Sequence, residues 1–313
     1  MTEVFLVTGG AGFIGSHLVE ALTARGLGVR VFDNFSTGLR SNLATLRPAP
    51  EVIDADLADA AALERAMTGV SVAYHLGALA SVQRSVETPE ITHEACSTGT
   101  LNVLNAARKH GVRRVIYASS SSAYGGWSSQ DGQNEDIPLN PLSPYAAAKL
   151  SGELYAQAFS ASYGLETVRC RFFNIFGPRQ RADSPYSGVI ALFITAMVQG
   201  RTPTVYGDGL QSRDFTYVAN AVQALVKAGQ TPGVSGRVYN VGTGSSITVR
   251  DLVAGLNKLL GTNLLPQHGA PRAGDVRFSR ADISRARRDL GYEPDICFEE
   301  GLKRTLRWYC DSQ

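Results

Sequence analysis

The sequence contains little cysteine, and the residues that occur form no recognisable motif. The four cysteines, Cys96, Cys170, Cys297 and Cys310, are scattered without the C-x-x-C spacing of a zinc site or a redox pair. This distribution indicates neither a structural zinc site nor a disulfide framework. The five histidines also lack metal-ligand spacing. We therefore predict no metal site and expect the histidines to be structural.

Excess charge of one sign and long apolar runs are absent as well. The formal net charge of +2 at pH 7 is too close to neutral to indicate a nucleic-acid or membrane surface. Recognition of an anion must therefore come from individual arginines. No apolar run is long enough to cross a bilayer, and the first residues lead directly into a predicted strand. We expect a cytoplasmic protein without a signal peptide.

A glycine-rich turn between an apolar strand and an amphipathic helix is the most informative feature that is present. Gly9, Gly12 and Gly15 follow the apolar run 4–7 and precede the helical pattern at 16–22. Such glycines allow a tight turn and bring a pyrophosphate close to backbone N–H groups at a helix N-terminus. A second apolar run ends at Asp33, roughly 20 residues further on, where a dinucleotide fold places an acid on the adenosine ribose. A carboxylate there repels a 2′-phosphate, so we predict NAD rather than NADP.

Short apolar strands alternate with helical patterns through the first half of the chain. Strands are predicted near 3–8, 28–33, 51–55, 70–76, 113–119 and 165–172, and helices near 13–25, 60–67, 88–110 and 144–163. This alternation predicts an α/β protein with a Rossmann-type, doubly wound parallel sheet covered on both faces. We predict an NAD-binding domain over 1–173, to which the chain returns around 210–243. Residues 174–313 mainly form a smaller C-terminal α/β lobe that binds the substrate.

Tyr145 and Lys149 form the candidate catalytic pair. They stand at i and i+4 directly after Pro144, which suits the first turn of a helix, so both side chains lie on one face. An ammonium near a phenol favours the phenolate, which makes Tyr145 a candidate general base. In isolation this spacing is more typical of a solvated helix, but the glycine turn and Asp33 favour catalysis. Ser120 ends a predicted strand at the edge where ligands bind, although several serines of the run 119–122 could simply cap backbone groups.

Taken together, these motifs resemble the extended short-chain dehydrogenase/reductase family. The resemblance is strongest to its UDP-hexose 4-epimerases. It covers essentially the whole chain, from the motif 8–15 to the segments 274–276 and 281–284. By its position before Tyr124-Gly125, Ser120 matches the catalytic serine or threonine of that group. Two positions depart from the pattern: Cys96 stands where an asparagine is usual, and Phe172 stands where many relatives have tyrosine.

The resemblance implies sets of cofactor-binding and substrate-binding residues. Those expected to contact NAD are Gly9, Gly12, Phe13, Ile14, Gly15, Asp33, Asn34, Phe35, Ser36, Thr37, Gly38, Asp56, Leu57, Leu76, Gly77, Ala78, Ala80, Tyr145, Lys149 and Phe173. Those expected to contact the UDP-sugar are Ser81, Ser120, Ser121, Tyr145, Asn174, Val189, Val205, Tyr206, Arg213, Arg272, Asp275 and Ser279. Within the second set, Arg213 and Arg272 are expected to clamp the diphosphate, and Val205 and Tyr206 to border the uracil.

The scaffold alone does not determine the reaction, because relatives include dehydratases and decarboxylases. Dehydratases resemble Thr-Asp-Glu at the strand end and decarboxylases resemble Thr-Ser-Glu, whereas this chain has Ser120-Ser121-Ser122 and no carboxylate. Without that acid and base, oxidation and re-reduction at C4 of the sugar remain, which is epimerisation. In this interpretation Tyr145 takes the O4 proton with help from Ser120, while Lys149 lowers the pKa of the tyrosine and holds the nicotinamide ribose.

The preferred sugar and the oligomeric state are further expectations. Ser279 aligns with a pocket-wall position at which a bulky tyrosine restricts relatives to glucose and galactose. A serine leaves room for an N-acetyl group, unless it is small for packing reasons. We predict action on UDP-GlcNAc/UDP-GalNAc and also on UDP-Glc/UDP-Gal. The alternatives are a UDP-glucuronate 4-epimerase, another reductase or dehydratase of the family, and a non-enzymatic NAD-sensing regulator. The helices near 88–110 and 144–163 are expected to pair in a homodimer, as in relatives.

Overall fold

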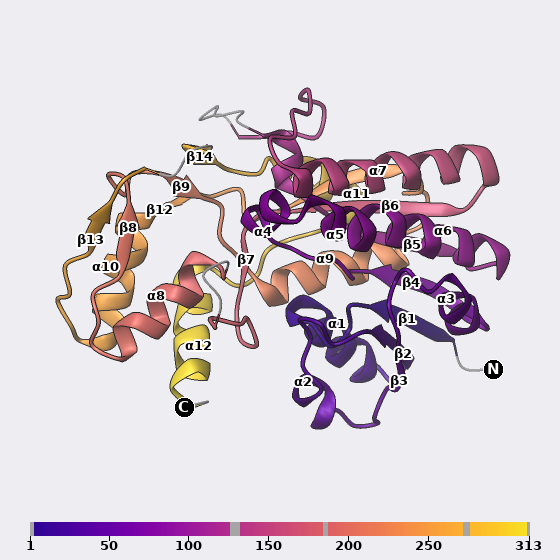
Figure 1. Ribbon diagram of the computed structural model, residues 1–313, viewed down its shortest axis with the longest axis horizontal. Helices are drawn as coiled ribbons and strands as arrows, with labels where there is room; N and C mark the ends of the chain where they lie inside the picture. Colours follow the sequence, from indigo (N-terminus) through magenta and orange to yellow (C-terminus); the bar gives the residue numbers. More distant parts are fainter. Residues whose placement is uncertain (1–2, 126–131, 184–186, 272–275, 312–313) are drawn as a thin grey trace.

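The computed structural model describes residues 3–125, 132–183, 187–271 and 276–311, and its centre is a parallel sheet (Figure 1). Seven strands lie in the order β11-β6-β5-β4-β1-β2-β3, and every neighbouring pair is parallel. Their bounds are β1 Val4–Thr8, β2 Gly28–Asp33, β3 Glu51–Asp54, β4 Val70–His75, β5 Arg114–Ser120, β6 Glu166–Phe172 and β11 Arg237–Val241. The predicted fold class and the six predicted strands are confirmed.

Side chains alternate between two cores because successive residues of a strand point to opposite faces of the sheet. In β1, Phe5 and Val7 belong to one buried cluster, and Leu6 between them belongs to the other. Helices α1 and α9 cover the first face, whereas α3, α6 and α7 cover the second. The bounds of the helices around the sheet are α1 Phe13–Thr23, α2 Ser41–Ala44, α3 Ala60–Met67, α4 Val82–Glu87, α5 Pro89–His93, α6 Gly99–Lys109, α7 Pro144–Tyr163 and α9 Val218–Gln230. Burial on both faces explains the nearly continuous apolar strands of the sequence.

The helix predicted at 88–110 is interrupted. A π-helical turn, Glu94–Thr98, lies between α5 and α6 and contains the buried Cys96. The short helices α2 and α4 were not predicted, because four and six residues are too few to show a helical period. Among the described residues, no helix has the length and apolar character needed to cross a membrane.

A smaller lobe, visible at the left of Figure 1, contains most of the chain after β6. Three small sheets pair β7 with β10, β8 with β13, and β9 with both β12 and β14. The strands are β7 Ile175–Phe176, β8 Thr204–Tyr206, β9 Ser212–Arg213, β10 Thr216–Tyr217, β12 Ile247–Thr248, β13 Gln267–Gly269 and β14 Phe278–Ser279. Its helices are α8 Val189–Val198, α10 Val249–Leu260 and α12 Phe298–Asp311. Helix α11, Ser284–Leu290, packs against β11 and α9 of the sheet domain. Between these elements the chain re-enters the central sheet through α9 and β11.

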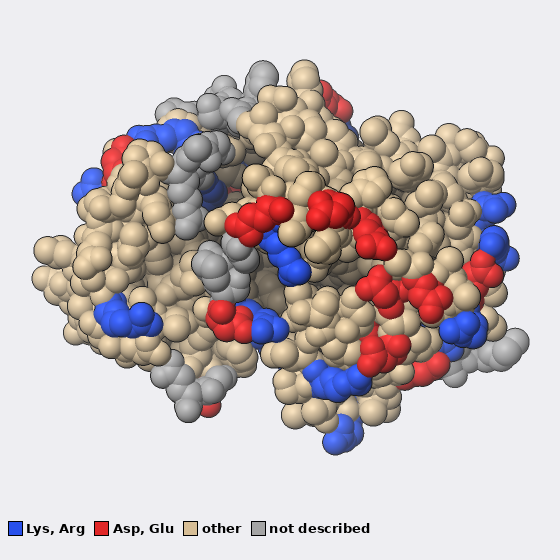
Figure 2. All heavy atoms as spheres, in the orientation of Figure 1, with Lys and Arg blue, Asp and Glu red and all other residues tan. Residues whose placement is uncertain are grey.

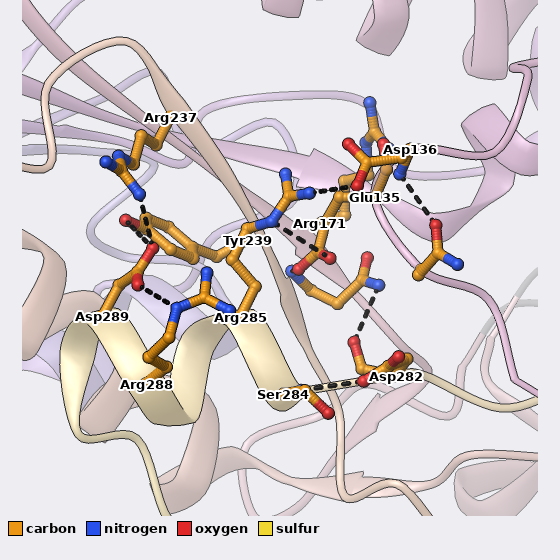
Figure 3. Close-up of polar contacts among 12 residues, drawn as sticks. Glu135, Asp136, Arg171, Arg237, Tyr239, Asp282, Ser284, Arg285, Arg288 and Asp289 are labelled. Carbon is orange, nitrogen blue, oxygen red and sulfur yellow. Dashed lines mark hydrogen bonds and ion pairs between the residues drawn. The ribbon is translucent and has the colours of Figure 1, made fainter.

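Polar contacts attach the segment before α7 to the C-terminal part of the chain (Figure 3). Arg285 of α11 pairs with Glu135 and Asp136, and Asp289 pairs with Arg237 of β11. Glu135 also accepts a hydrogen bond from the backbone N–H of Asn240 at 2.8 Å. These contacts hold the approach to the helix that carries Tyr145 against the edge of the sheet.

Candidate active site

A cavity of about 670 Å³ lies at the carboxyl ends of the central strands. Figure 2 shows this face of the molecule hollowed between the sheet and the smaller lobe. Seventeen of the twenty predicted cofactor residues line the cavity: Gly9, Gly12, Phe13, Ile14, Gly15, Asp33, Asn34, Ser36, Thr37, Asp56, Leu57, Leu76, Gly77, Ala78, Ala80, Tyr145 and Lys149. The structure therefore brings together residues that are more than a hundred positions apart in the sequence.

The glycine turn is packed so closely that side chains do not fit. A Cβ on Gly15 would lie 2.0 Å from the carbonyl oxygen of Gly9, and a Cβ on Gly9 would lie 2.7 Å from the backbone nitrogen of Gly77. Gly9 also has a φ of 67°, in the left-handed region that favours glycine. The helix N-terminus and the strand ends thus present bare backbone to the cavity, as a pyrophosphate requires.

Asp33 stands at the end of β2 with a defined orientation. Its carboxylate accepts hydrogen bonds from the backbone N–H groups of Ala11 at 2.9 Å and Phe35 at 2.8 Å. A fixed carboxylate at this strand end suits ribose hydroxyl groups and repels a phosphate. The bare glycine turn and Asp33 together fit NAD.

Three predicted cofactor residues do not line the cavity. Gly38 packs against Ala11, and the ring of Phe35 lies beneath the Arg40 guanidinium, 3.9 Å from its centroid. Phe173 is fully buried and packs against the ring of Tyr124. The partly exposed Phe172 lines the cavity instead. The side chain predicted to contact the cofactor, Phe173, is thus turned away from the cavity, because consecutive residues at a strand end point in opposite directions.

The catalytic candidates meet where β5 ends and α7 begins. Pro144 occupies the first turn of α7, as the sequence predicts, and the Ser143 side chain caps the helix. Tyr145 and Lys149 are buried on one side of this helix and line the cavity. The Ser120 hydroxyl acts to lower the pKa of the Tyr145 phenol. Ser120 also accepts a hydrogen bond from the Ser122 hydroxyl at 2.8 Å.

The electrostatics of the pair differ from the expectation. Burial is the largest influence on Tyr145 and raises the pKa of its phenol above the ordinary value. The Lys149 ammonium donates to the carbonyl oxygen of Ala118 at 2.8 Å, and it is not among the groups that shift the pKa of Tyr145. Burial lowers the pKa of Lys149, whereas Cys96 and Glu153 raise it. In the protein by itself, Tyr145 is therefore a neutral phenol at pH 7.

The predicted substrate residues fall into several groups. Ser81 lines the cavity beside Tyr145. Arg213 and Ser279 are direct partners in the pairing of β9 with β14, and Asn174 donates to the carbonyl oxygen of Asp214. Ser121 begins a 3₁₀ turn after Ser120, Val189 begins α8, and both are partly exposed. Arg272 and Asp275 lie outside the described residues.

One substrate prediction requires correction. Val205 is 1% exposed and packs in the core, so its side chain cannot border a uracil. Tyr206, its neighbour on β8, is exposed. The alternation of side chains along a three-residue strand explains the difference.

Sequence reasoning also missed residues that line the cavity. Arg179, Arg181 and Asp183 enter it from the smaller lobe, and Arg181 donates to the carbonyl oxygen of Thr37 at 3.3 Å. The only signal for this segment was the punctuation Gly177-Pro178, which indicates a turn without specifying where it leads.

Comparisons with known proteins agree with this geometry. The model of the NAD dependent epimerase/dehydratase family matches residues 5–242. The UDP-glucose 4-epimerase of Mycolicibacterium smegmatis is 38% identical over 312 residues, covering 97% of each chain. The structure of a UDP-N-acetylglucosamine 4-epimerase from Methanobrevibacter ruminantium, in complex with UDP-N-acetylmuramic acid, superposes with a TM-score of 0.94 at 38% identity over 100% of both chains. The Thermus thermophilus UDP-glucose 4-epimerase in complex with NAD has a TM-score of 0.90 at 35% identity, covering 99% of this chain and 100% of that one.

Proposed function

The chain belongs to the NAD-dependent epimerase/dehydratase family, and from this premise we propose that it is a 4-epimerase of UDP-hexoses acting through a 4-keto sugar. NAD is its cofactor, and when bound it accepts a hydride from the sugar and returns it. The cofactor is regenerated in each turnover, so it remains with the protein and is not consumed.

The observation that carries this proposal is the absence of a carboxylate after Ser120. The family includes both epimerases and dehydratases, so membership alone does not separate the two reactions. Elimination of water needs an acid and a base next to the sugar. Here the 3₁₀ turn that follows Ser120 begins with Ser121 and Ser122, and the Ser122 hydroxyl is bonded to that of Ser120. Removal and return of a hydride at C4 needs no such pair.

The chain's own residues then handle one proton. In its phenolate form, Tyr145 accepts the proton of the sugar's O4 hydroxyl and later returns it, and Ser120, which acts to lower the pKa of Tyr145, relays the proton. Lys149 adds a positive charge to a site that burial has made unfavourable for the phenolate. Both faces of the 4-keto sugar must reach Tyr145, which requires that the molecule be held by its diphosphate.

Arg213 and Ser279 support the substrate assignment. They are backbone partners in the pairing of β9 with β14, so a guanidinium suited to a diphosphate and the small Ser279 come from neighbouring strands. We propose that the small side chain of Ser279 leaves room for an N-acetyl group, so that both the UDP-GlcNAc/UDP-GalNAc pair and the UDP-Glc/UDP-Gal pair are interconverted. The variant Ser279→Tyr is then expected to lose turnover of the acetylated pair while keeping that of the other pair. If wild-type protein ignores the acetylated pair, this part of the proposal is wrong.

A homodimer is part of the proposal. Helices α4, α5 and α6 pack against α7, and this group leaves exposed apolar side chains at Val82, Val86, Ile91, Leu154 and Tyr155. An apolar surface spread over α4, α5 and α7 suits an interface between two copies of the chain.

The function is tested by NMR time courses with UDP-Glc and UDP-GlcNAc in parallel, with no cofactor added. We expect conversion of each to its C4 epimer by protein that carries NAD from purification. Turnover that stops until NAD(P)H is supplied would identify a reductase instead. Inertness toward both sugars together with activity on UDP-glucuronate would favour that alternative. Bound NAD without turnover of any UDP-sugar would indicate a regulator.

A further inference from the structure

A buried carboxylate lies beside the catalytic candidates and has no role in the mechanism above. Glu153 is on α7, one helical turn after Lys149, and its side chain is 1% exposed. It accepts hydrogen bonds from Arg171 Nε at 2.8 Å and from Arg171 Nη2 at 2.7 Å, and a third from the Ser119 hydroxyl. A buried charge needs such complete pairing, because an unpaired carboxylate in the interior is strongly disfavoured.

These hydrogen bonds join the elements that carry the catalytic candidates. Ser119 directly precedes Ser120 at the end of β5, and Glu153 shares α7 with Tyr145 and Lys149. Arg171 is the penultimate residue of β6 and precedes Phe172, which lines the cavity. One carboxylate thus ties two strand ends to the catalytic helix.

The contacts continue from Arg171 to the smaller lobe. Arg171 donates to the Tyr124 hydroxyl at 2.9 Å, and this hydroxyl donates to Asn240 Oδ1 at 2.6 Å. Asn240 Nδ2 in turn donates to the carbonyl oxygens of Gln133 and Asp282. The network therefore ends next to the polar cluster in which Arg285 reaches Glu135 (Figure 3).

We propose that Glu153 is a positioning residue that sets Ser120 against Tyr145 and keeps the buried Lys149 side chain in its ammonium form. The geometric part follows from the bond to Ser119, since any movement of Glu153 moves the strand end that carries Ser120. The electrostatic part follows from charge balance. Without the carboxylate, the buried Arg171 guanidinium would lose its ion-pair partner, and Lys149 would lose a carboxylate that raises its pKa.

Among the groups around Lys149, Glu153 is the carboxylate that stabilises its ammonium form. Lys149 lies on the same face of α7 as Tyr145 and faces the Tyr117 ring of β5 at 5.0 Å. Cys96 of the π-helical turn and His75 of β4 also interact with it. Burial lowers the pKa of His75 to about 3, so this ring is neutral. Among the groups that raise the pKa of Lys149, Glu153 is the carboxylate and Cys96 is a buried thiol.

The test compares Glu153→Gln with the matched control Glu166→Gln. Glu166 pairs with Arg114, and this pair joins the first residues of β5 and β6. Glu153 contacts the same two strands near their last residues, at Ser119 and Arg171. The chain has five lysines, Lys109, Lys149, Lys227, Lys258 and Lys303. Their ¹³Cε signals can therefore be titrated individually by NMR, with Lys149 assigned from Lys149→Arg.

We expect the titration of Lys149 to move down by about one pH unit in Glu153→Gln and to stay unchanged in Glu166→Gln. In Glu153→Gln, the high-pH limb of the plot of kcat against pH should move to lower pH together with the Lys149 titration, while KM changes less than twofold. A merely structural role would lower Tm in both variants without moving either profile. An unchanged Lys149 titration in folded Glu153→Gln overturns the proposal.

Glu153→Asp carries the test if Glu153→Gln does not fold. The shorter side chain keeps the charge but cannot reach both Ser119 and Arg171, so we expect a Lys149 titration near that of wild type and a kcat at least tenfold lower. A wild-type kcat in this variant would overturn the positioning role. The activity measurements rest on the proposed epimerisation, whereas the lysine titration does not. A shifted titration in a protein that epimerises nothing would therefore refute the function and leave the placement of Glu153 standing.

Discussion

At the residue scale, the chemistry of this site depends on buried side chains. Tyr145, Lys149 and Glu153 are all buried on one helix, and burial raises the pKa of Tyr145 and lowers that of Lys149. The neutral phenol of Tyr145 becomes a base only when a positive charge is close to it.

The role of Tyr145 can be tested by removing its hydroxyl. In Tyr145→Phe, kcat is expected to fall by several orders of magnitude, because the hydroxyl that exchanges the O4 proton is lost, while KM changes little. The conversion of UDP-Glc followed by NMR measures both constants, and NAD content of the variant serves as the control for folding. Near-normal turnover would remove Tyr145 from the mechanism.

His75 makes a prediction about stability. Its ring lies between the hydroxyls of Thr8 at 2.7 Å and Thr100 at 2.9 Å, and its pKa is lowered from 6.5 to about 3. Below pH 6.5 the unfolded chain binds a proton that the folded chain excludes. The free energy of unfolding should therefore fall by about 2 kcal/mol between pH 6.5 and 5 on account of this residue.

The measurement is urea unfolding of wild type and His75→Asn at pH 6.5 and 5. The asparagine does not titrate in this range, so the variant should lose less stability over the interval, although its absolute stability is lower. Equal losses in the two proteins would show that His75 does not carry this pH dependence.

At the scale of elements, the site depends on how closely a strand, a turn and a helix approach one another. Gly9 and Gly15 set the separation of β1 and α1. The apolar residues of the strand and of the helix on either side of this turn are buried. The predicted bounds of these elements agree with the structure to within two residues, because hydrophobic period and capping residues act locally. The π-helical turn at Glu94–Thr98 had no such signal in the sequence.

Gly15→Ala tests the closeness of that approach. The added methyl group would collide with the Gly9 carbonyl oxygen, so the turn must open and the backbone N–H groups must leave their positions. We expect the purified variant to carry less than a tenth of the wild-type NAD, measured by absorbance after denaturation, and to melt at a lower temperature. Gly255→Ala is the control: there the new methyl would meet only a Leu302 methyl at 3.4 Å, so NAD content should be unchanged. Full NAD occupancy in Gly15→Ala would show that the turn tolerates a side chain.

At the scale of the whole molecule, the cavity is formed jointly by the sheet domain and the smaller lobe. Arg179 and Arg181 follow β6 in the sequence, in the part of the chain that forms the smaller lobe, and they line the same cavity as the glycine turn. The proposed dimer surface on α4, α5 and α7 borders this space, because Ile91 belongs to that surface and also lines the cavity.

Leu154→Arg tests the proposed dimer. Leu154 is 59% exposed on α7, and a charge there would be buried without a partner in the interface. We expect wild type to elute as a dimer and the variant as a monomer in size-exclusion chromatography with light scattering. Leu265→Arg, at a leucine 76% exposed in the smaller lobe, should remain a dimer. A wild-type monomer would refute this part of the proposal.

The sequence by itself determined the strands of the parallel sheet, the glycine turn, Asp33 and the Tyr145–Lys149 pair, because a local pattern of residues identifies each of them. Only the tertiary structure decided which of Phe172 and Phe173 lines the cavity, and that Val205 is withdrawn into the core. It also brought Glu153 to Ser119 and Arg171, which are 34 and 18 positions away. The physical reason is that local period and capping specify an element. Which of its side chains meet a distant partner depends on how the elements pack.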